Sequence, residues 1–226
     1  YCVGRNWAGQ LGDGSTTDRT ALVELVNNTG KTPKTFECGG NITSILMTDG
    51  TIYGCGSNGG GLGLGEGSDG NYTSLQQLIN NTGKTIKEFH TRWGKTVLLM
   101  TDGSVYGVGY ETYMNTNTII YSLTEFTGNN TGKTIDKIAL GWNWFLMLMT
   151  DGTIYGVGSN AYGQLGTGTV GTEDTVGASN SKTHYTAIQL VNNTGKTPTG
   201  VFCSIQSSHV LMSDGSVYSC GWGASG

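Results

Sequence analysis

The tetrapeptide TGKT occurs four times and contains the residue types of a phosphate-binding loop. A Walker loop places a glycine five residues before the glycine of GKT and is followed by a helix, so that backbone amides surround the phosphate. No helical periodicity follows these copies, and the glycine is replaced by Leu25, Leu78, Thr127 and Leu190. We therefore expect turns that bind no nucleotide, with largely solvated lysines on one face: Lys31, Lys84, Lys133 and Lys196.

Residues suited to metal binding or catalysis are few and scattered. The three histidines fall at unlike positions of the sequence pattern: His90, His184 and His209. Asp13 with Asp18, and Glu66 with Asp69, lack the spacing of a calcium-binding loop and favour turn capping. No hydroxyl or thiol recurs with a histidine and a carboxylate beside it. We expect no catalytic residue, no metal and no cofactor, and a protein that is not an enzyme.

The net charge bears on the kind of partner, and the cysteines bear on the compartment. The formal net charge of -4 argues against a nucleic-acid surface, which needs clustered Lys and Arg. No apolar stretch approaches the roughly 18 residues of a membrane span, so no membrane insertion is expected. Cys38 and Cys203, like Cys55 and Cys220, fall at matching positions of a repeat, which favours core thiols and an intracellular over a secreted compartment. Asn-X-Ser/Thr sequons leave glycosylation open as the alternative.

The chain repeats itself. The segment LMTDGTIYGCGSN at Leu46 returns in near copies at Leu99, Leu148 and Leu211. Aligned on the tyrosine after each Asp-Gly, the periods are 52, 53, 49 and 63 residues, and the units are 1–52, 53–105, 106–154, 155–217 and the start of a fifth, 218–226. A period near fifty indicates a solenoid or a propeller. The opening YCVG copies the middle of a unit, so we expect a processed or partial chain.

Each unit divides into four strand-like pieces. In the first unit these are TFECGG around Phe36, ITSILM ending at Met47, TIYGCG from Thr51 and LQQLIN from Leu75. An Asp-Gly pair separates the second and third pieces and predicts a two-residue hairpin turn with positive φ at both residues. These structural turns are Asp49-Gly50, Asp102-Gly103, Asp151-Gly152 and Asp214-Gly215. The repeated NNTGKT predicts the turn that links one unit to the next.

Four short antiparallel strands per unit favour the blades of a β-propeller, in which radial repetition buries each sheet against its neighbours. The 39 glycines and the charged fraction of 12% also suit an all-β protein with many tight turns. We expect one propeller region over residues 1–226, with about four blades present.

The repeats resemble those of the regulator of chromosome condensation 1 (RCC1) family. The resemblance rests on GRNWAGQLGDG at Gly4 and GSNAYGQLGTG at Gly158, each followed downstream by copies of LMTDGTIYGCG. It implies a propeller of seven blades, of which about four are present, unless the chain closes as a small four-bladed ring. It also implies a nucleotide exchange factor, an interaction module or an inhibitor. The family histidine before the second strand is replaced by Asn41, Gly94, Asn143 and Gln206, so exchange activity is not carried over.

The loops that vary between units are the candidate partner-binding surface. Large aromatic residues in loops are typical binding anchors, but they also fill gaps between blades. The insertion Gly168–Tyr185 lengthens one loop and either adds to a binding surface or is simply tolerated. The candidates are Trp7, Tyr110, Tyr113, Tyr162, Thr172, Glu173 and Asp174. We expect a protein-interaction scaffold with a protein partner. The alternatives are an exchange factor for a small GTPase and a structural component of a large assembly or viral particle.

Overall fold

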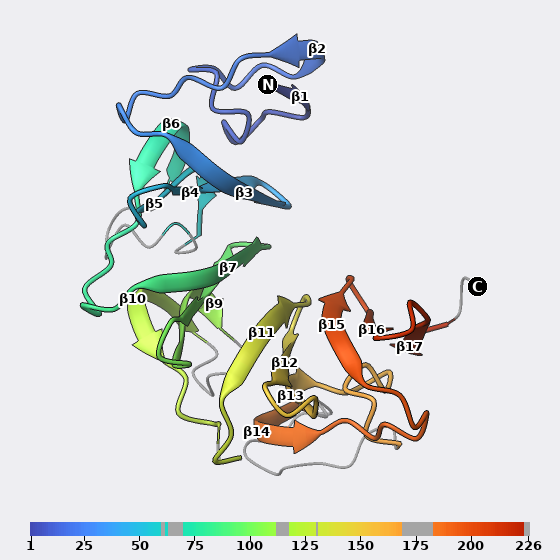
Figure 1. The fold of residues 1–226 in the computed structure, drawn as a ribbon. Helices are drawn as coiled ribbons and strands as arrows, with labels where there is room; N and C mark the ends of the chain where they lie inside the picture. The colour runs from blue at the N-terminus through green and yellow to red at the C-terminus, as the bar shows by residue number, and fades with distance from the viewer. Residues whose placement is uncertain (60–61, 63–69, 112–117, 130, 169–182, 224–226) are drawn as a thin grey trace. The chain divides into compact units, whose positions relative to one another are not determined.

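The structure, a computed structural model, describes residues 1–59, 62, 70–111, 118–129, 131–168 and 183–223. All regular structure within these ranges is β-strand (Figure 1), and they contain no helix long and apolar enough to cross a bilayer. The chain divides into two compact units. The first comprises residues 1–111 and 118–125, and the second comprises residues 112–117 and 126–226.

The first unit contains a strand pair and two complete sheets. The pair, called the half-blade here, is formed by β1 (Cys2–Gly4) and β2 (Arg19–Val23). Blade I consists of β3 (Pro33–Gly39), β4 (Ile42–Met47), β5 (Ile52–Asn58) and β6 (Gly70–Gln77). Blade II consists of β7 (Ile86–Arg92), β8 (Lys95–Met100), β9 (Val105–Glu111) and β10 (Thr118–Glu125). Both blades are antiparallel and keep their strands in sequence order.

The second unit contains one complete sheet and one of three strands. Blade III consists of β11 (Ile135–Leu140), β12 (Trp144–Met149), β13 (Ile154–Ser159) and β14 (Thr183–Gln189). Blade IV consists of β15 (Pro198–Cys203), β16 (Ser207–Met212) and β17 (Val217–Gly221). The expected all-β propeller fold with four-stranded antiparallel blades is confirmed. The fourth strand of blade I begins at Gly70, five residues before the Leu75 predicted from the apolar pattern.

The second strand of each complete blade forms the centre of the core. Every residue of β4, β8 and β12 is buried, including the polar residues Thr43, Ser44, Lys95 and Thr96. In the first unit Leu46 and Leu98 join one cluster, and in the second unit Leu146 and Leu148 join another. Trp144 lies fully buried in β12 and donates its indole N–H to Ser208 Oγ at 3.0 Å.

The Asp-Gly pairs lie in the hairpins, but the predicted two-residue turn is wrong. Met47 N donates to Thr51 O at 2.8 Å and Gly50 N donates to Met47 O at 3.0 Å, which leaves a three-residue loop of Thr48, Asp49 and Gly50. Gly50 has φ of 85°, whereas Asp49 is not among the residues with positive φ. The turn therefore needs glycine at one position only, as in a type I turn followed by a left-handed residue.

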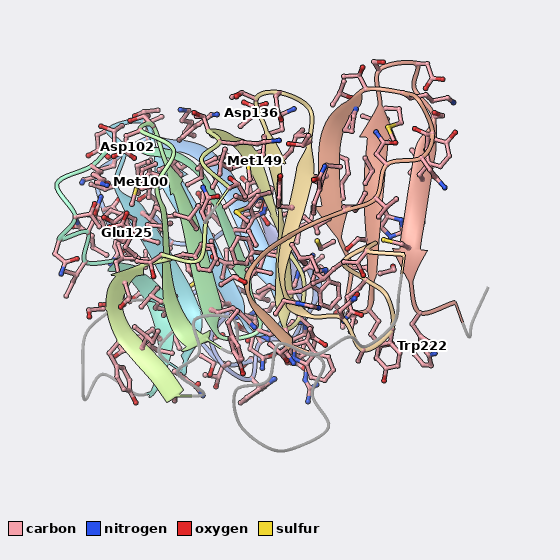
Figure 2. The ribbon with its side chains drawn as sticks, turned by 90° about the horizontal axis from the view of Figure 1, so that it is seen from below. Met100, Asp102, Glu125, Asp136, Met149 and Trp222 are labelled. Carbon is pink, nitrogen blue, oxygen red and sulfur yellow. The ribbon has the colours of Figure 1, made fainter. Side chains whose placement is uncertain are left out.

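Antiparallel order gives every blade two distinct ends. The hairpin end carries the Asp-Gly loop between the second and third strands and the NNTGKT linker to the next blade. The loop end carries the turn between the first and second strands and the loop after the third strand. In the second unit, Figure 2 shows Asp136 and Met149 at the hairpin end and Trp222 at the loop end.

Candidate protein-interaction surface

A lysine at the hairpin end of each blade is held by three neighbouring groups. In blade I, Lys31 Nζ lies 2.8 Å from Asp49 Oδ2, donates to Thr51 Oγ1 at 3.0 Å and lies 5.3 Å from the centre of the Tyr53 ring. Asp49 Oδ1 in turn accepts hydrogen bonds from the backbone N–H and the hydroxyl of Thr51. The lysine thus joins the linker to the hairpin of the blade that follows it.

This four-residue contact, called the lysine clamp here, is repeated in every blade. The lysine–carboxylate distance is 2.9 Å in blade II and 2.8 Å in blades III and IV. The other three clamps are Lys84-Asp102-Ser104-Tyr106, Lys133-Asp151-Thr153-Tyr155 and Lys196-Asp214-Ser216-Tyr218.

The clamp sets the electrostatics of the hairpin end. Hydrogen bonds from Lys133 and then Thr153 hold the pKa of Asp151 well below its usual range, and the bond to Asp151 raises the pKa of Lys133. The four lysine side chains retain only 29 to 34% exposure, so the expectation that they are largely solvated is wrong. Their ammonium groups are already paired with a carboxylate and placed over an aromatic ring.

The linker itself is organised by its first asparagine. Asn27 Oδ1 accepts from the Thr29 hydroxyl at 2.6 Å, and Asn27 Nδ2 donates to the Lys31 carbonyl at 2.8 Å. Lys31 N donates to Thr29 Oγ1 at 3.1 Å, which closes the turn. The same bonds recur around Asn80, Asn129 and Asn192. The repeated NNTGKT thus builds a turn, and the amide of its sequon asparagine is used inside that turn.

The loop after the third strand is organised by a buried asparagine that the sequence analysis missed. Three asparagines are fully or almost fully buried: Asn6, Asn58 and Asn160. Each accepts through Oδ1 a hydrogen bond from the backbone N–H of a buried leucine in the same loop, which is Leu11, Leu62 or Leu165. The signal was present in the sequence, because an asparagine follows the third-strand glycine at the same offset in GRN, GSN and GSN.

The acidic residues considered for calcium serve the first of these loops. Asp13 Oδ1 accepts from the backbone and hydroxyl of Ser15 and from Asn6 Nδ2, while Oδ2 accepts from Arg19 Nε at 2.7 Å. Burial raises the pKa of Asp13, but the bonds from Ser15, Arg19 and Asn6 outweigh it and lower the pKa to about 2. Asp18 Oδ1 accepts from Asn6 N. These carboxylates stabilise the loop, and Glu66 and Asp69 lie outside the described residues.

Histidines and cysteines form no common centre in the described ranges. His90 lies 3.0 Å from Glu88 and 3.6 Å from Glu37, whereas His209 contacts Ser207 and Ser219. All five cysteines are free. Burial raises the pKa of the Cys55 thiol to about 12, so this thiol is unreactive at neutral pH. Within these ranges no group of three His, Cys, Asp or Glu residues is placed to hold a metal.

Aromatic side chains gather at the loop ends of the blades. Trp7, Trp93, Trp142, Tyr162 and Trp222 all lie in loop-end segments and are 45 to 49% exposed. In the second unit the Tyr162 and Trp222 rings are 5.7 Å apart, and in the first unit the Arg5 guanidinium lies 5.9 Å from the Trp7 ring centre. Trp7 and Tyr162 lie on loops fixed by the buried Asn6 and Asn160, and half-exposed rings on such fixed loops can bury much apolar area at low entropic cost.

The candidate partner-binding residues are only partly placed by the structure. Trp7 and Tyr162 lie at loop ends, as described above. Tyr110 has its backbone in β9, but its side chain is outside the described part of the chain. Four further candidates lie outside the described residues: Tyr113, Thr172, Glu173 and Asp174. The same holds for most of the insertion Gly168–Tyr185.

The antiparallel blades are those of a β-propeller, and comparison with known proteins confirms the resemblance to RCC1-like propellers. Residues 135–164 match the family model for the Regulator of chromosome condensation (RCC1) repeat. Human WBSCR16 is 18% identical, with a TM-score of 0.76 over 98% of this chain and 56% of that one.

Two structures of yeast Prp20 show a similar fold over nearly the whole of this chain. Yeast RCC1 (Prp20), solved bound to Kap60, is 16% identical, with a TM-score of 0.57 over 97% of this chain and 63% of that one. Prp20p from Saccharomyces cerevisiae, described with its binding properties to Gsp1p and histones, is 16% identical with a TM-score of 0.54, over 97% and 65% of the two chains. The chain thus spans between 56% and 65% of the length of these structures, and at such identities the likeness is one of fold.

Proposed function

We propose that this chain is a non-enzymatic protein-interaction scaffold that binds a protein partner through the loop ends of its blades. The observation that carries the proposal is the contrast between the two ends. At the hairpin end the lysine clamps pair the charged groups with one another. At the loop end five aromatic side chains stay half-exposed, and two of them, Trp7 and Tyr162, lie on loops whose backbones are held by buried asparagines.

The chemistry of the loop end suits a protein partner. Tryptophan and tyrosine are enriched among the residues that dominate binding energies in protein interfaces. Tyr162 and Trp222 form such a pair beside a loop that Asn160 and Gln164 hold through the backbone N–H groups of Leu165 and Tyr162. A preorganised loop loses less conformational entropy on binding. The yeast structures, which concern interactions with Kap60, Gsp1p and histones, support a protein as the kind of partner.

The test compares the two ends within the second unit. The parent chain, a Tyr162→Ala/Trp222→Ala variant and a Val217→Ala control are immobilised, and captured proteins are identified by mass spectrometry. Val217 is an exposed apolar residue at the hairpin end of blade IV, so the control removes apolar surface from the other end. We expect the double variant to lose the partner that the parent and the control retain, with at least a tenfold weaker Kd for the purified pair.

A catalytic outcome is measured with the same proteins. If the captured partner is a small GTPase, release of a fluorescent guanine nucleotide is followed with and without the chain. If the chain accelerates release of the nucleotide, the function is that of an exchange factor and the scaffold proposal is wrong. The proposed surface would be contradicted if the loop-end double variant still captured the partner and the hairpin-end variant Val217→Ala did not. That result would favour a structural role in an assembly.

A further inference from the structure

Five Asp-Gly pairs of the chain are followed directly by serine or threonine. Four of them lie in the hairpin loops of the blades, and the fifth is Asp13-Gly14 in the loop after β1. The backbone requires glycine at these places, since φ is 82° at Gly14 and 85° at Gly50, in the left-handed region. The same dipeptide is prone to rearrange chemically, because glycine has no side chain to hinder attack by its own backbone nitrogen on the aspartate carboxyl group.

This rearrangement needs no reagent except water, and the Asp49 side chain is 47% exposed to it. The backbone nitrogen of Gly50 bonds to Cγ of Asp49, and one carboxyl oxygen leaves as water together with the amide proton and the carboxyl proton. Water then opens the resulting succinimide ring at either carbonyl carbon. Opening at Cγ restores aspartate. Opening at the original main-chain carbonyl carbon yields isoaspartate, in which the main chain runs through Cγ and the carboxylate is attached to Cα.

In the hairpin loop of blade I both oxygens of the reacting carboxyl group are held. Asp49 Oδ1 accepts hydrogen bonds from the Thr51 N–H at 3.0 Å and from the Thr51 hydroxyl at 2.6 Å. Asp49 Oδ2 lies 2.8 Å from Lys31 Nζ. The bond from Lys31, followed by those from Thr51, keeps the pKa of Asp49 below its usual range. The carboxylate therefore stays ionised, and an ionised carboxylate is a poor electrophile without the proton that the leaving water needs.

The attacking nitrogen of the same loop is held as well. Gly50 N donates to the Met47 carbonyl at 3.0 Å, and the equivalent bond is 2.9 to 3.0 Å long in the other three hairpins. For Gly50 N to reach Cγ of Asp49, the carboxylate has to turn away from its partners and the amide has to leave this carbonyl. The folded loop thus opposes the reaction at both reacting groups.

The loop after β1 reaches the same arrangement with a different cation. Asp13 Oδ1 accepts from the backbone N–H and the hydroxyl of Ser15, and Oδ2 lies 2.6 Å from Arg19 Nη2. Gly14 N donates to the Thr73 carbonyl at 3.0 Å. This loop is not a hairpin, so the held carboxylate and the held glycine amide belong to Asp-Gly-Ser/Thr in both settings and not to one type of turn.

We propose that these Asp-Gly pairs are modification sites protected by their paired cation, and that each forms isoaspartate once the lysine or arginine is removed from the carboxylate. The product cannot rebuild the same contact, because isoaspartate adds one carbon to the main chain of the loop and brings the carboxylate closer to Cα. Opening of a clamp is thereby converted into a permanent change at that site. The five sites are Asp13-Gly14, Asp49-Gly50, Asp102-Gly103, Asp151-Gly152 and Asp214-Gly215.

The test changes one lysine in the complete chain. Lys31→Met removes the cation from Asp49, whereas Lys31→Arg replaces it with the guanidinium group that pairs with Asp13. The matched control is Lys34→Met, which removes an exposed lysine outside the clamp. Each protein is kept at neutral pH in water labelled with oxygen-18, which every hydrolysis of a succinimide incorporates. Mass spectrometry of proteolytic fragments then measures isoaspartate at each pair, and the parent unfolded in guanidinium chloride gives the unprotected rate.

We expect Lys31→Met to raise the rate of isoaspartate formation at Asp49 about tenfold, because loss of a charge-assisted bond lowers the barrier to leaving the clamp. The other three clamps of the same molecules serve as internal references and should keep the parental rate. Lys31→Arg and Lys34→Met should keep the parental rate at every pair. Circular dichroism checks that each variant folds, and Arg19→Met with Arg19→Lys repeats the comparison at Asp13, so the test does not depend on one variant.

Three results would overturn the proposal. The first is an unchanged rate at Asp49 in folded Lys31→Met, or a rate in the folded parent equal to that of the unfolded chain. The second is an equal rise at all four clamps, because general unfolding would then be the cause. The third is a rise in Lys31→Arg as large as in Lys31→Met, since the cation would then not be what protects the carboxylate.

Discussion

The two ends of each blade are built from the same repeat but use their side chains in opposite ways. At the hairpin end four lysine clamps repeat the same ion pair to within 0.1 Å, from 2.8 to 2.9 Å. At the loop end the buried asparagine is kept in three loops, while the residues around it change from Trp7 to Gly59 to Ala161. Repeat copying thus keeps the same ion pair at the hairpin end, whereas divergence at the loop end changes the exposed residues from blade to blade.

The largest effect on stability should come from the scaffold of the loop end. Replacing Asn160 by Ala leaves the buried Leu165 N–H without its acceptor, which costs about 2–3 kcal/mol. Urea unfolding followed by tryptophan fluorescence measures the loss. The matched control is Asn193→Ala, which removes an exposed amide and should change the free energy of unfolding by less than about 0.5 kcal/mol. Equal stability of the two variants would refute a structural role for Asn160.

A smaller loss is expected from the turn at the hairpin end. Gly152 has φ of 81°, and Thr197 Cγ2 would be the nearest atom to an added Cβ at an ordinary 3.6 Å. Gly152→Val is therefore strained by its backbone alone, at a cost of about 1–2 kcal/mol. Gly152→Asn is the control, because asparagine tolerates the left-handed region better. If both variants have the same free energy of unfolding as the parent, glycine is not required in this loop.

The lysine clamp should contribute a still smaller and pH-dependent stability. The folded state lowers the pKa of Asp151, so the unfolded chain binds more protons once the pH falls below about 4, the value of a free aspartate. The stabilisation is present above that pH and is lost progressively as the pH falls toward the lowered pKa. Thermal unfolding of Asp151→Asn should show a lower Tm than the parent at pH 7 and a narrowing difference at pH 3.

A double-mutant cycle isolates the clamp from its separate residues. Lys133→Met combined with Asp151→Asn should lower the Tm by less than the sum of the single changes, because either change alone breaks the same ion pair. Strict additivity, or a Tm difference between the parent and Asp151→Asn that does not change between pH 7 and pH 3, would show that the pair is only a surface contact.

The sequence predicted the features that depend on neighbouring residues. The blades, the position of the hairpins and the glycine at Gly50 follow from local alternation and turn chemistry. The clamp could not be predicted in this way, since it joins Lys31 to a carboxylate 18 residues further on and depends on how the linker folds back.

The smallest effect on stability is expected where the effect on binding is largest. Tyr162 and Trp222 are half-exposed, contact each other at the loop end and have no ring N–H or O–H bond in the described hydrogen-bond network. Truncating both to Ala removes rings of which about half the surface is already in water, so the free energy of unfolding should fall by less than in Asn160→Ala. Partner affinity should nevertheless fall at least tenfold, because a partner would desolvate both rings together. Calorimetric unfolding and titration of the same double variant measure the two quantities. A loss of stability as large as that of Asn160→Ala would mean that these rings stabilise the loop end, and the contrast between a uniform hairpin end and a proposed binding surface at the loop end would then fail at this blade.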